Sequence, residues 1–230
     1  MRKIFVACDT SSIPKAKAVI RGTNLKIKNY KIGYKFGLEF FYSAGGRNFI
    51  SKLKRIPVFL DLKINDIPNT ATAALKSLRD LKNINYITVH INGGYEMIKC
   101  VKKEAKKINK NIKILGVSVL TSLSPRAFKA IGYKKTIKDT VKLHAKLARK
   151  AKLDGIICSA HEVKYLKKIC KGMEIITPGI RLSGDKIQDQ KRVTTPLMAF
   201  KNGANAIVIG RSITIGNPKL NMQKLINSLS

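Results

Sequence analysis

Residues 57–70 read PVFLDLKINDIPNT, a short apolar run followed by a polar loop and a proline. Apolar and polar side chains alternate toward the end of the run, which is typical of a β-strand whose two faces meet different surroundings. Pro68 suits the first turn of a helix, and the segment ATAALKSLRDLK after it has a helical composition. The stretch therefore predicts one strand, loop and helix unit.

The same unit recurs along the chain, because short runs rich in Val and Ile alternate with longer segments of helical period. The spaces between the runs have room for a crossover helix and two loops. Eight such units in 230 residues predict a single-domain (β/α)8 TIM barrel, an α/β fold, over residues 1–230. An open doubly wound sheet is the alternative, but no G-x-G-x-x-G follows the first run. The expected strands are residues 3–9, 28–34, 57–63, 86–91, 113–120, 155–160, 174–180 and 206–211.

The composition excludes several classes of protein. The chain is 44% apolar, and no apolar run approaches the roughly 18 residues of a membrane span, so we expect no membrane partner. Asp9 interrupts the N-terminal run before it could serve as a signal peptide. The four cysteines form no C-x-x-C pair, which argues against a zinc site or a disulfide framework. We expect a cytoplasmic protein with reduced thiols.

The chain is strongly basic, with 46 Lys and Arg against 13 Asp and Glu and a formal net charge of +33. In residues 138–151, a lysine recurs every four positions while Val141, Ala145 and Ala148 fall on another face, as in an amphipathic helix with a solvated side. The basic residues are not interleaved with aromatic ones, as a base-stacking surface would be. We therefore expect no specific nucleic-acid partner, although a non-catalytic, basic nucleic-acid-binding barrel remains an alternative.

The scarce carboxylates gather where the first and third strands end. Asp61 and Lys63 share a strand face with Phe59, and the same alternation places Asp9 on the corresponding face of the first strand. In a TIM barrel, catalytic groups lie at the carboxyl ends of the strands. The charged residues expected to converge at the barrel mouth are Asp9, Lys31, Asp61 and Lys63, with Asp66 in the loop that follows.

Such a cluster has two interpretations, because buried charges are costly unless they are paired. It could be an ion-pair lattice that only holds the strand ends together. It could also be a preorganised site whose carboxylates repel an anionic group of the substrate and whose ammonium groups stabilise or protonate a carbanion. The location at the mouth favours the second interpretation, and that chemistry is decarboxylation.

These residues also carry a family resemblance. The D-x-K-x-x-D-I-P-x-T pattern at Asp61, Lys63, Asp66, Pro68 and Thr70 resembles the signature of the orotidine 5'-phosphate decarboxylase family of bacterial type. Further stretches are similar to those of the family and occur in the same order across nearly the whole chain: ACD, YKIGYKFGLEFF, VHINGG, VLTSLS, GIICSAHE, TPGIR and VIGRSIT.

The resemblance implies that the chain decarboxylates orotidine 5'-monophosphate to uridine 5'-monophosphate in pyrimidine biosynthesis, without a metal or cofactor. It implies a catalytic group of Lys31, Asp61, Lys63 and Asp66, in which Lys63 donates the proton. It further implies a homodimer, in which Asp66 and Thr70 reach into the partner's site. A magnesium-dependent keto-sugar-phosphate decarboxylase or hexulose-phosphate synthase is the enzymatic alternative, against which the DIPNT and TPGIR stretches speak.

The phosphate end can also be argued from physical chemistry. Gly210 and Arg211 end the eighth run, where TIM barrels commonly bind phosphate, and an arginine offers phosphate a fork of donors. By resemblance, Arg181 and Gln190 complete this grip, Thr121 contacts the pyrimidine, and Asp9 and Lys31 hold the ribose hydroxyls. The full set of predicted substrate-binding residues is Asp9, Lys31, Asp61, Thr70, Thr121, Pro178, Arg181, Gln190, Gly210 and Arg211.

Overall fold

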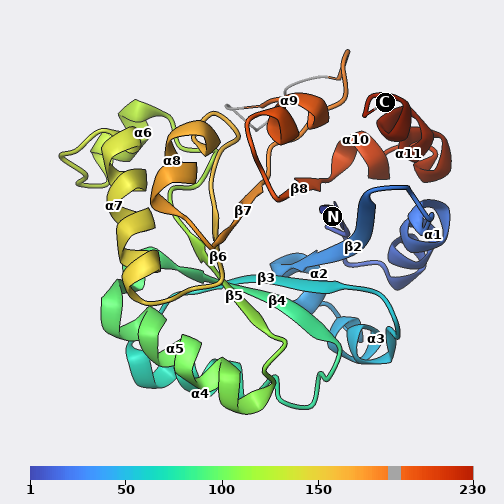
Figure 1. Cartoon of the computed structure of the whole chain (residues 1–230). Coiled ribbons are helices and arrows are strands. Elements are labelled where there is room, and N and C mark those ends of the chain that lie inside the picture. Colours follow the sequence, from blue (N-terminus) through green and yellow to red (C-terminus); the bar gives the residue numbers. More distant parts are fainter. Residues whose placement is uncertain (186–192, 230) are drawn as a thin grey trace.

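Eight parallel strands close into a barrel in a computed structural model that describes residues 1–185 and 193–229 (Figure 1). Each strand pairs with the next along the chain, and β1 pairs with β8 to complete the circle. The predicted TIM barrel is confirmed, and the open-sheet alternative is wrong. The strands are β1 (Arg2–Ala7), β2 (Tyr30–Gly37), β3 (Val58–Ile64), β4 (Ile84–His90), β5 (Lys113–Val117), β6 (Gly155–Ile157), β7 (Glu174–Thr177) and β8 (Ala206–Ile209).

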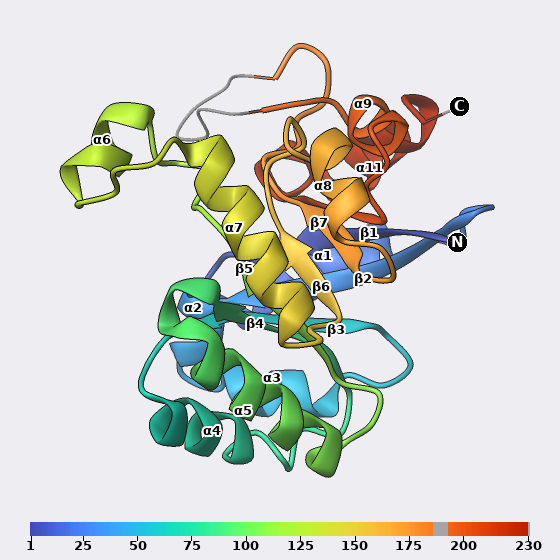
Figure 2. The ribbon, with the colours of Figure 1, turned by 60° about the vertical axis from the view of Figure 1, so that its left-hand side comes forward.

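The helices lie outside the strands and cover the barrel wall (Figures 1 and 2). Within the described residues, no helix has both the length and the apolar character needed to cross a bilayer. The helices are α1 (Ile13–Thr23), α2 (Leu38–Tyr42), α3 (Gly46–Lys52), α4 (Pro68–Lys76), α5 (Gly94–Ile108), α6 (Pro125–Ala130), α7 (Ile137–Lys150), α8 (Val163–Ile169), α9 (Pro196–Lys201), α10 (Arg211–Thr214) and α11 (Pro218–Asn227), with a 3-10 turn η1 (Ile91–Gly93) before α5.

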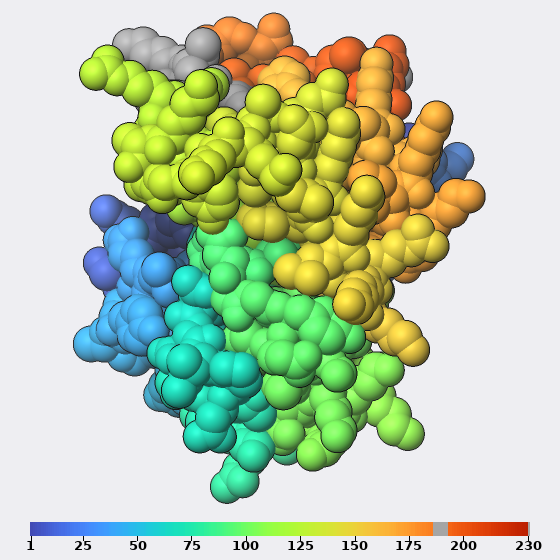
Figure 3. Space-filling model, turned by 90° about the vertical axis from the view of Figure 1, so that its left-hand side faces the viewer, coloured from blue at the N-terminus to red at the C-terminus, as the bar shows by residue number. Residues whose placement is uncertain are grey.

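Helix α7 shows how local sequence sets an element and its orientation. Thr136 caps its first turn by accepting a hydrogen bond from the backbone of Asp139. Val141, Ala145 and Ala148 are buried, while the predicted lysine stripe faces outward. Figure 3 views the molecule from this side, where α5 and α7 form much of the surface. Burial of one apolar face therefore leaves the lysines in solvent.

The barrel interior holds an aromatic cluster below the mouth. The Phe5 ring packs edge-on against the rings of Phe59 and Tyr86, with 5.2 Å between centroids in both pairs. All three side chains are buried and belong to the inner core of the barrel. Gly33 of β2 gives Phe5 the space for this arrangement. We call Phe5, Phe59 and Tyr86 the aromatic floor, because the inward-facing residues that follow them in their strands are polar or small.

We expect Gly33→Ala to destabilise the barrel by about 1–3 kcal/mol, because the cluster has no room for a methyl group. The added Cβ would lie 2.8 Å from Cε1 of Phe5 and 2.9 Å from the carbonyl oxygen of Pro57, which already accepts the Tyr34 N–H. A urea titration followed by circular dichroism measures the change. Lys76→Ala, at an exposed position on α4, is the control. An unchanged unfolding midpoint for Gly33→Ala would refute this account of the floor.

Candidate active site at the mouth of the barrel

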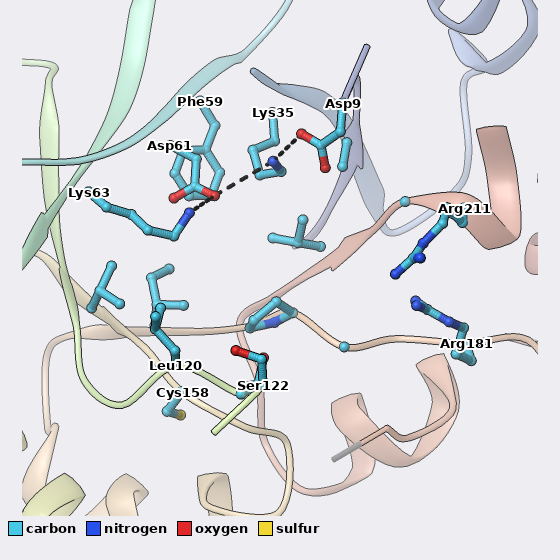
Figure 4. A pocket seen from close by; sticks show the side chains of 18 of the residues that line it. Asp9, Lys35, Phe59, Asp61, Lys63, Leu120, Ser122, Cys158, Arg181 and Arg211 are labelled. Carbon is cyan, nitrogen blue, oxygen red and sulfur yellow. Dashed lines mark hydrogen bonds and ion pairs between the residues drawn. The ribbon is translucent and has the colours of Figure 1, made fainter. Parts of the chain in front are cut away.

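A cavity of about 470 Å³ opens at the carboxyl ends of the strands (Figure 4). Its walls come from strand ends and from the loops that follow them, so residues distant in sequence face one another. The charged and polar residues that line it are Asp9, Lys35, Asp61, Lys63, Thr121, Ser122, Arg181, Arg211 and Thr214.

One side of the cavity carries an alternating chain of acids and ammonium groups. The Lys35 Nζ lies 2.7 Å from Asp9 Oδ1 and 3.6 Å from Asp61 Oδ2, and the Lys63 Nζ lies 2.8 Å from the same Asp61 oxygen. These four residues project from the ends of β1, β2 and β3 toward one another (Figure 4). We call them the charged chain.

The buried members of the charged chain stabilise each other's ionised forms. Burial alone would raise the pKa of Asp61, but Lys35 and Lys63, together with hydrogen bonds from Lys63 and Thr88, hold that pKa below its ordinary value. Burial alone would lower the pKa of Lys35, but Asp61 and Asp9 raise it above its ordinary value. The charged forms of Asp61 and Lys35 are therefore both favoured in the folded protein.

Lys31 does not belong to this chain, and the prediction that it lies at the mouth is wrong. Strand β2 runs over Tyr30–Gly37, so Lys31 lies near its start, paired in register with Lys3 at the opposite end of the barrel. There Glu174 accepts hydrogen bonds from Lys3 and Lys113, and Lys31 lines a small pocket with these two lysines. The predicted strand, residues 28–34, ends three residues too early.

Lys35 takes the position that was expected of Lys31, and the sequence contains a signal for it. The second strand holds two K-x-G triplets, residues 31–33 and 35–37, and only the second lies at the strand end. A Cβ on Gly37 would lie 3.0 Å from Asp9 Oδ1 and 3.2 Å from Lys35 Nζ. Glycine at this position therefore leaves room for the Asp9–Lys35 ion pair.

Asp66 and Thr70 do not line the cavity of their own chain. Both are exposed, and Asp66 Oδ1 accepts a hydrogen bond from the Ile67 backbone just before α4. They therefore lie on the outer surface beside the mouth.

The opposite side of the cavity carries two guanidinium groups. Arg181 follows β7 and Arg211 follows β8, and both side chains point toward the same part of the cavity (Figure 4). Burial and the charge of Arg211 lower the pKa of Arg181, an effect that Asp185 opposes. Gly179 and Gly210 line the cavity near them. The two positive charges repel each other, and an anion bound between them would relieve this repulsion. The pair therefore suits a multiply charged oxyanion. Gln190, predicted to join this grip, lies outside the described residues.

The wall between the two charged ends is largely apolar. Thr121 and Pro178, both predicted to bind the substrate, line it beside Val117, Ile157 and Val208. An apolar slot with a few polar groups suits a flat ring that carries polar edges.

Metal ligands do not gather anywhere in the described part of the chain: no three His, Cys, Asp or Glu side chains come together there as a metal-binding group. In the cavity, Asp9 and Asp61 are both within ion-pair distance of Lys35.

Comparison with known proteins gives the chain its family. The sequence model of the Orotidine 5'-phosphate decarboxylase / HUMPS family matches residues 2–222. The chain belongs to this family. The resemblance noted in the sequence is thereby confirmed, and so is the predicted enzyme class, a carboxy-lyase.

Individual members of the family are similar along most or all of their length. An orotidine 5'-phosphate decarboxylase of Sphingopyxis alaskensis is 40% identical over 92% of this chain and 91% of its own. The crystal structure of orotidine 5'-phosphate decarboxylase from Lactobacillus acidophilus has a TM-score of 0.84 at 33% identity, and covers 100% of both chains. That of orotidine 5'-monophosphate decarboxylase from Methanocaldococcus jannaschii, complexed with the inhibitor BMP, has a TM-score of 0.75 at 26% identity, over 100% of this chain and 99% of its own.

The lowered pKa of Asp61 predicts a pH-dependent contribution to stability. Its ionised form is favoured by folding, so its contribution is present above the unfolded pKa of about 3.9 and is lost as the pH falls through the folded value. Asp61→Asn leaves Lys35 and Lys63 without their shared partner. We expect the variant to be less stable than the wild type near pH 7, and this difference to shrink below about pH 4. Urea titrations at the two pH values measure it; an equal difference at both would contradict the assignment.

Proposed function

We propose that the chain decarboxylates orotidine 5'-monophosphate to uridine 5'-monophosphate, a step of pyrimidine biosynthesis. The observation that carries the proposal is one cavity with alternating charges at one end and two guanidinium groups at the other. A substrate with a phosphate at one end and a ring carboxylate at the other matches this distribution. Membership of the family supports the same substrate.

The two ends of the cavity divide the work of binding. Arg181, Arg211 and the backbone at Gly210 would hold the phosphate, with Gln190 as a further proposed donor. The slot at Thr121 and Pro178 would take the pyrimidine. Asp9 and Lys35 would hold the ribose hydroxyls, the role first expected of Lys31. Binding the remote phosphate would supply energy that is used at the reacting carbon.

The charged chain would perform the chemistry. The Asp61 carboxylate, fixed in its ionised form, would lie against the substrate carboxylate and repel it. The bond between carbon six and the carboxylate breaks, carbon dioxide leaves, and the electron pair stays on carbon six. The Lys63 ammonium, 2.8 Å from Asp61, would stabilise this anion and then donate its proton to carbon six.

A homodimer would complete the site with Asp66 and Thr70 of the partner subunit. Both residues are exposed beside the mouth and outside their own cavity. Large apolar side chains also stand exposed just after β2 and at the start of α4: Leu38, Tyr42 and Ile67. Exposed apolar side chains beside exposed polar ones are typical of an interface between subunits.

The activity is tested by the loss of orotidine 5'-monophosphate absorbance in EDTA-treated enzyme, with Lys35→Met and Lys31→Met as matched variants. We expect turnover by the wild type without metal. Lys35→Met should lose about 100-fold or more in kcat/KM, because it removes the ammonium group that lies between Asp9 and Asp61. Lys31→Met should stay within about threefold of the wild type, because Lys31 lies at the other end of the barrel.

Two results would overturn parts of the proposal. A wild type that needs magnesium would favour the sugar-phosphate alternative. A wild type without turnover that binds random DNA with a steep salt dependence would favour the basic nucleic-acid-binding barrel.

A shared site predicts recovery of activity when two inactive variants are mixed. In a mixed dimer of Lys63→Ala and Asp66→Ala, one of the two sites receives both intact residues. Random exchange of subunits should therefore restore about a quarter of wild-type activity. Mass spectrometry of differently tagged subunits shows whether exchange has occurred. Exchange without recovery would exclude the contribution of Asp66 across the interface.

A further inference from the structure

Strand β3 leaves regular pairing with β4 at the residues that would carry the chemistry. Leu60 pairs with Ile87 of β4, but the next paired residue of β3 is Ile64, opposite Val89. Three residues, 61–63, therefore face Thr88 alone. A bulge of this kind removes backbone groups from the strand ladder, and these groups need other partners.

The backbone of Lys63 adopts a left-handed conformation inside this bulge, with φ of 49°. This conformation is costly for any residue but glycine and persists only where the surroundings hold it. The Lys63 N–H donates to Thr88 Oγ1 at 2.9 Å. Thr88 is fully buried, so water cannot take the place of its hydroxyl in this hydrogen bond.

The same hydroxyl determines how the Asp61 carboxylate is turned. Thr88 Oγ1 donates to Asp61 Oδ1 at 2.9 Å, and the Lys63 Nζ donates to the other oxygen, Oδ2, at 2.8 Å. A hydroxyl has one proton, and Oγ1 already accepts from Lys63. The backbone of Lys63, Thr88, Asp61 and the Lys63 ammonium are thus joined in a closed cycle of three hydrogen bonds.

We propose that Thr88 is a positioning residue, whose hydroxyl fixes both the plane of the Asp61 carboxylate and the backbone that carries the Lys63 ammonium. The inference rests on the proposed function, in which these two groups act on the substrate. Thr88 does not line the cavity, so it would act only through Asp61 and Lys63. Such positioning affects rate strongly, because an error of about 1 Å in a reacting group can cost about 100-fold.

The test compares Thr88→Val, Thr88→Ser and Thr177→Val. Valine keeps the shape of threonine without its hydroxyl, and serine keeps the hydroxyl. Thr177 on β7 is the matched control: it is also fully buried, and its hydroxyl has no hydrogen-bond partner among the described residues. We expect Thr88→Val to lower kcat about 10- to 100-fold with KM within about threefold. Thr88→Ser and Thr177→Val should stay within about threefold of the wild type in kcat.

Two further readouts separate positioning from packing and do not depend on turnover. In Thr88→Val, the Lys63 amide should exchange with deuterium faster, and the pKa of Asp61, followed by carboxyl NMR, should rise, because each loses its hydrogen bond to the hydroxyl. If the wild type has no activity on orotidine 5'-monophosphate, the proposed function fails while these two measurements still test the hydrogen-bonded cycle.

The proposal is overturned if Thr88→Val is folded and retains wild-type kcat. It is also overturned if kcat of Thr88→Ser is as low as that of Thr88→Val. Thermal unfolding of each variant shows which are folded. If Thr88→Val does not fold, Thr88→Ala replaces it: a Ser variant no faster than the Ala variant would equally refute a role for the hydroxyl.

Discussion

Asp61 is the centre on which the arrangement of the mouth depends. It lies between Lys35 and Lys63, and both ammonium groups approach the same carboxylate oxygen. Without the carboxylate, two positive charges would face each other in a partly dehydrated space; without the ammonium groups, burial would raise the pKa of the carboxylate. The ends of β2 and β3 are therefore held together by Lys35 and Asp61, two buried groups that favour each other's charged forms.

This mutual dependence explains why small residues and irregular backbone surround the site. Gly37 leaves space for the Asp9–Lys35 pair, and at the bulge in β3 the hydroxyl of Thr88 bonds both the Asp61 carboxylate and the Lys63 backbone. Pairing with β4 is regained only at Ile64, the last residue of the strand.

Some residues of the site could be predicted from the sequence and others could not. Alternation of side chains placed Asp61 and Lys63 at the mouth, because their strand ends where its apolar run ends. It could not decide between Lys31 and Lys35, which lie on the same face of one strand, since the choice depends on where pairing with β1 and β3 stops. The contacts of the Thr88 hydroxyl could not be predicted from the sequence either, because they depend on a bulge in the pairing of β3 with β4. Pairing in space, not composition, determined both outcomes.

The aromatic floor has a consequence for the source of protons. Phe5, Phe59 and Tyr86 pack against one another beneath the charged chain, and all three side chains are buried. With a substrate filling the mouth, an anion formed there would meet the ammonium of Lys63 before any water molecule. The floor would thus limit the supply of protons from below, and Lys63 would be the group that protonates the anion.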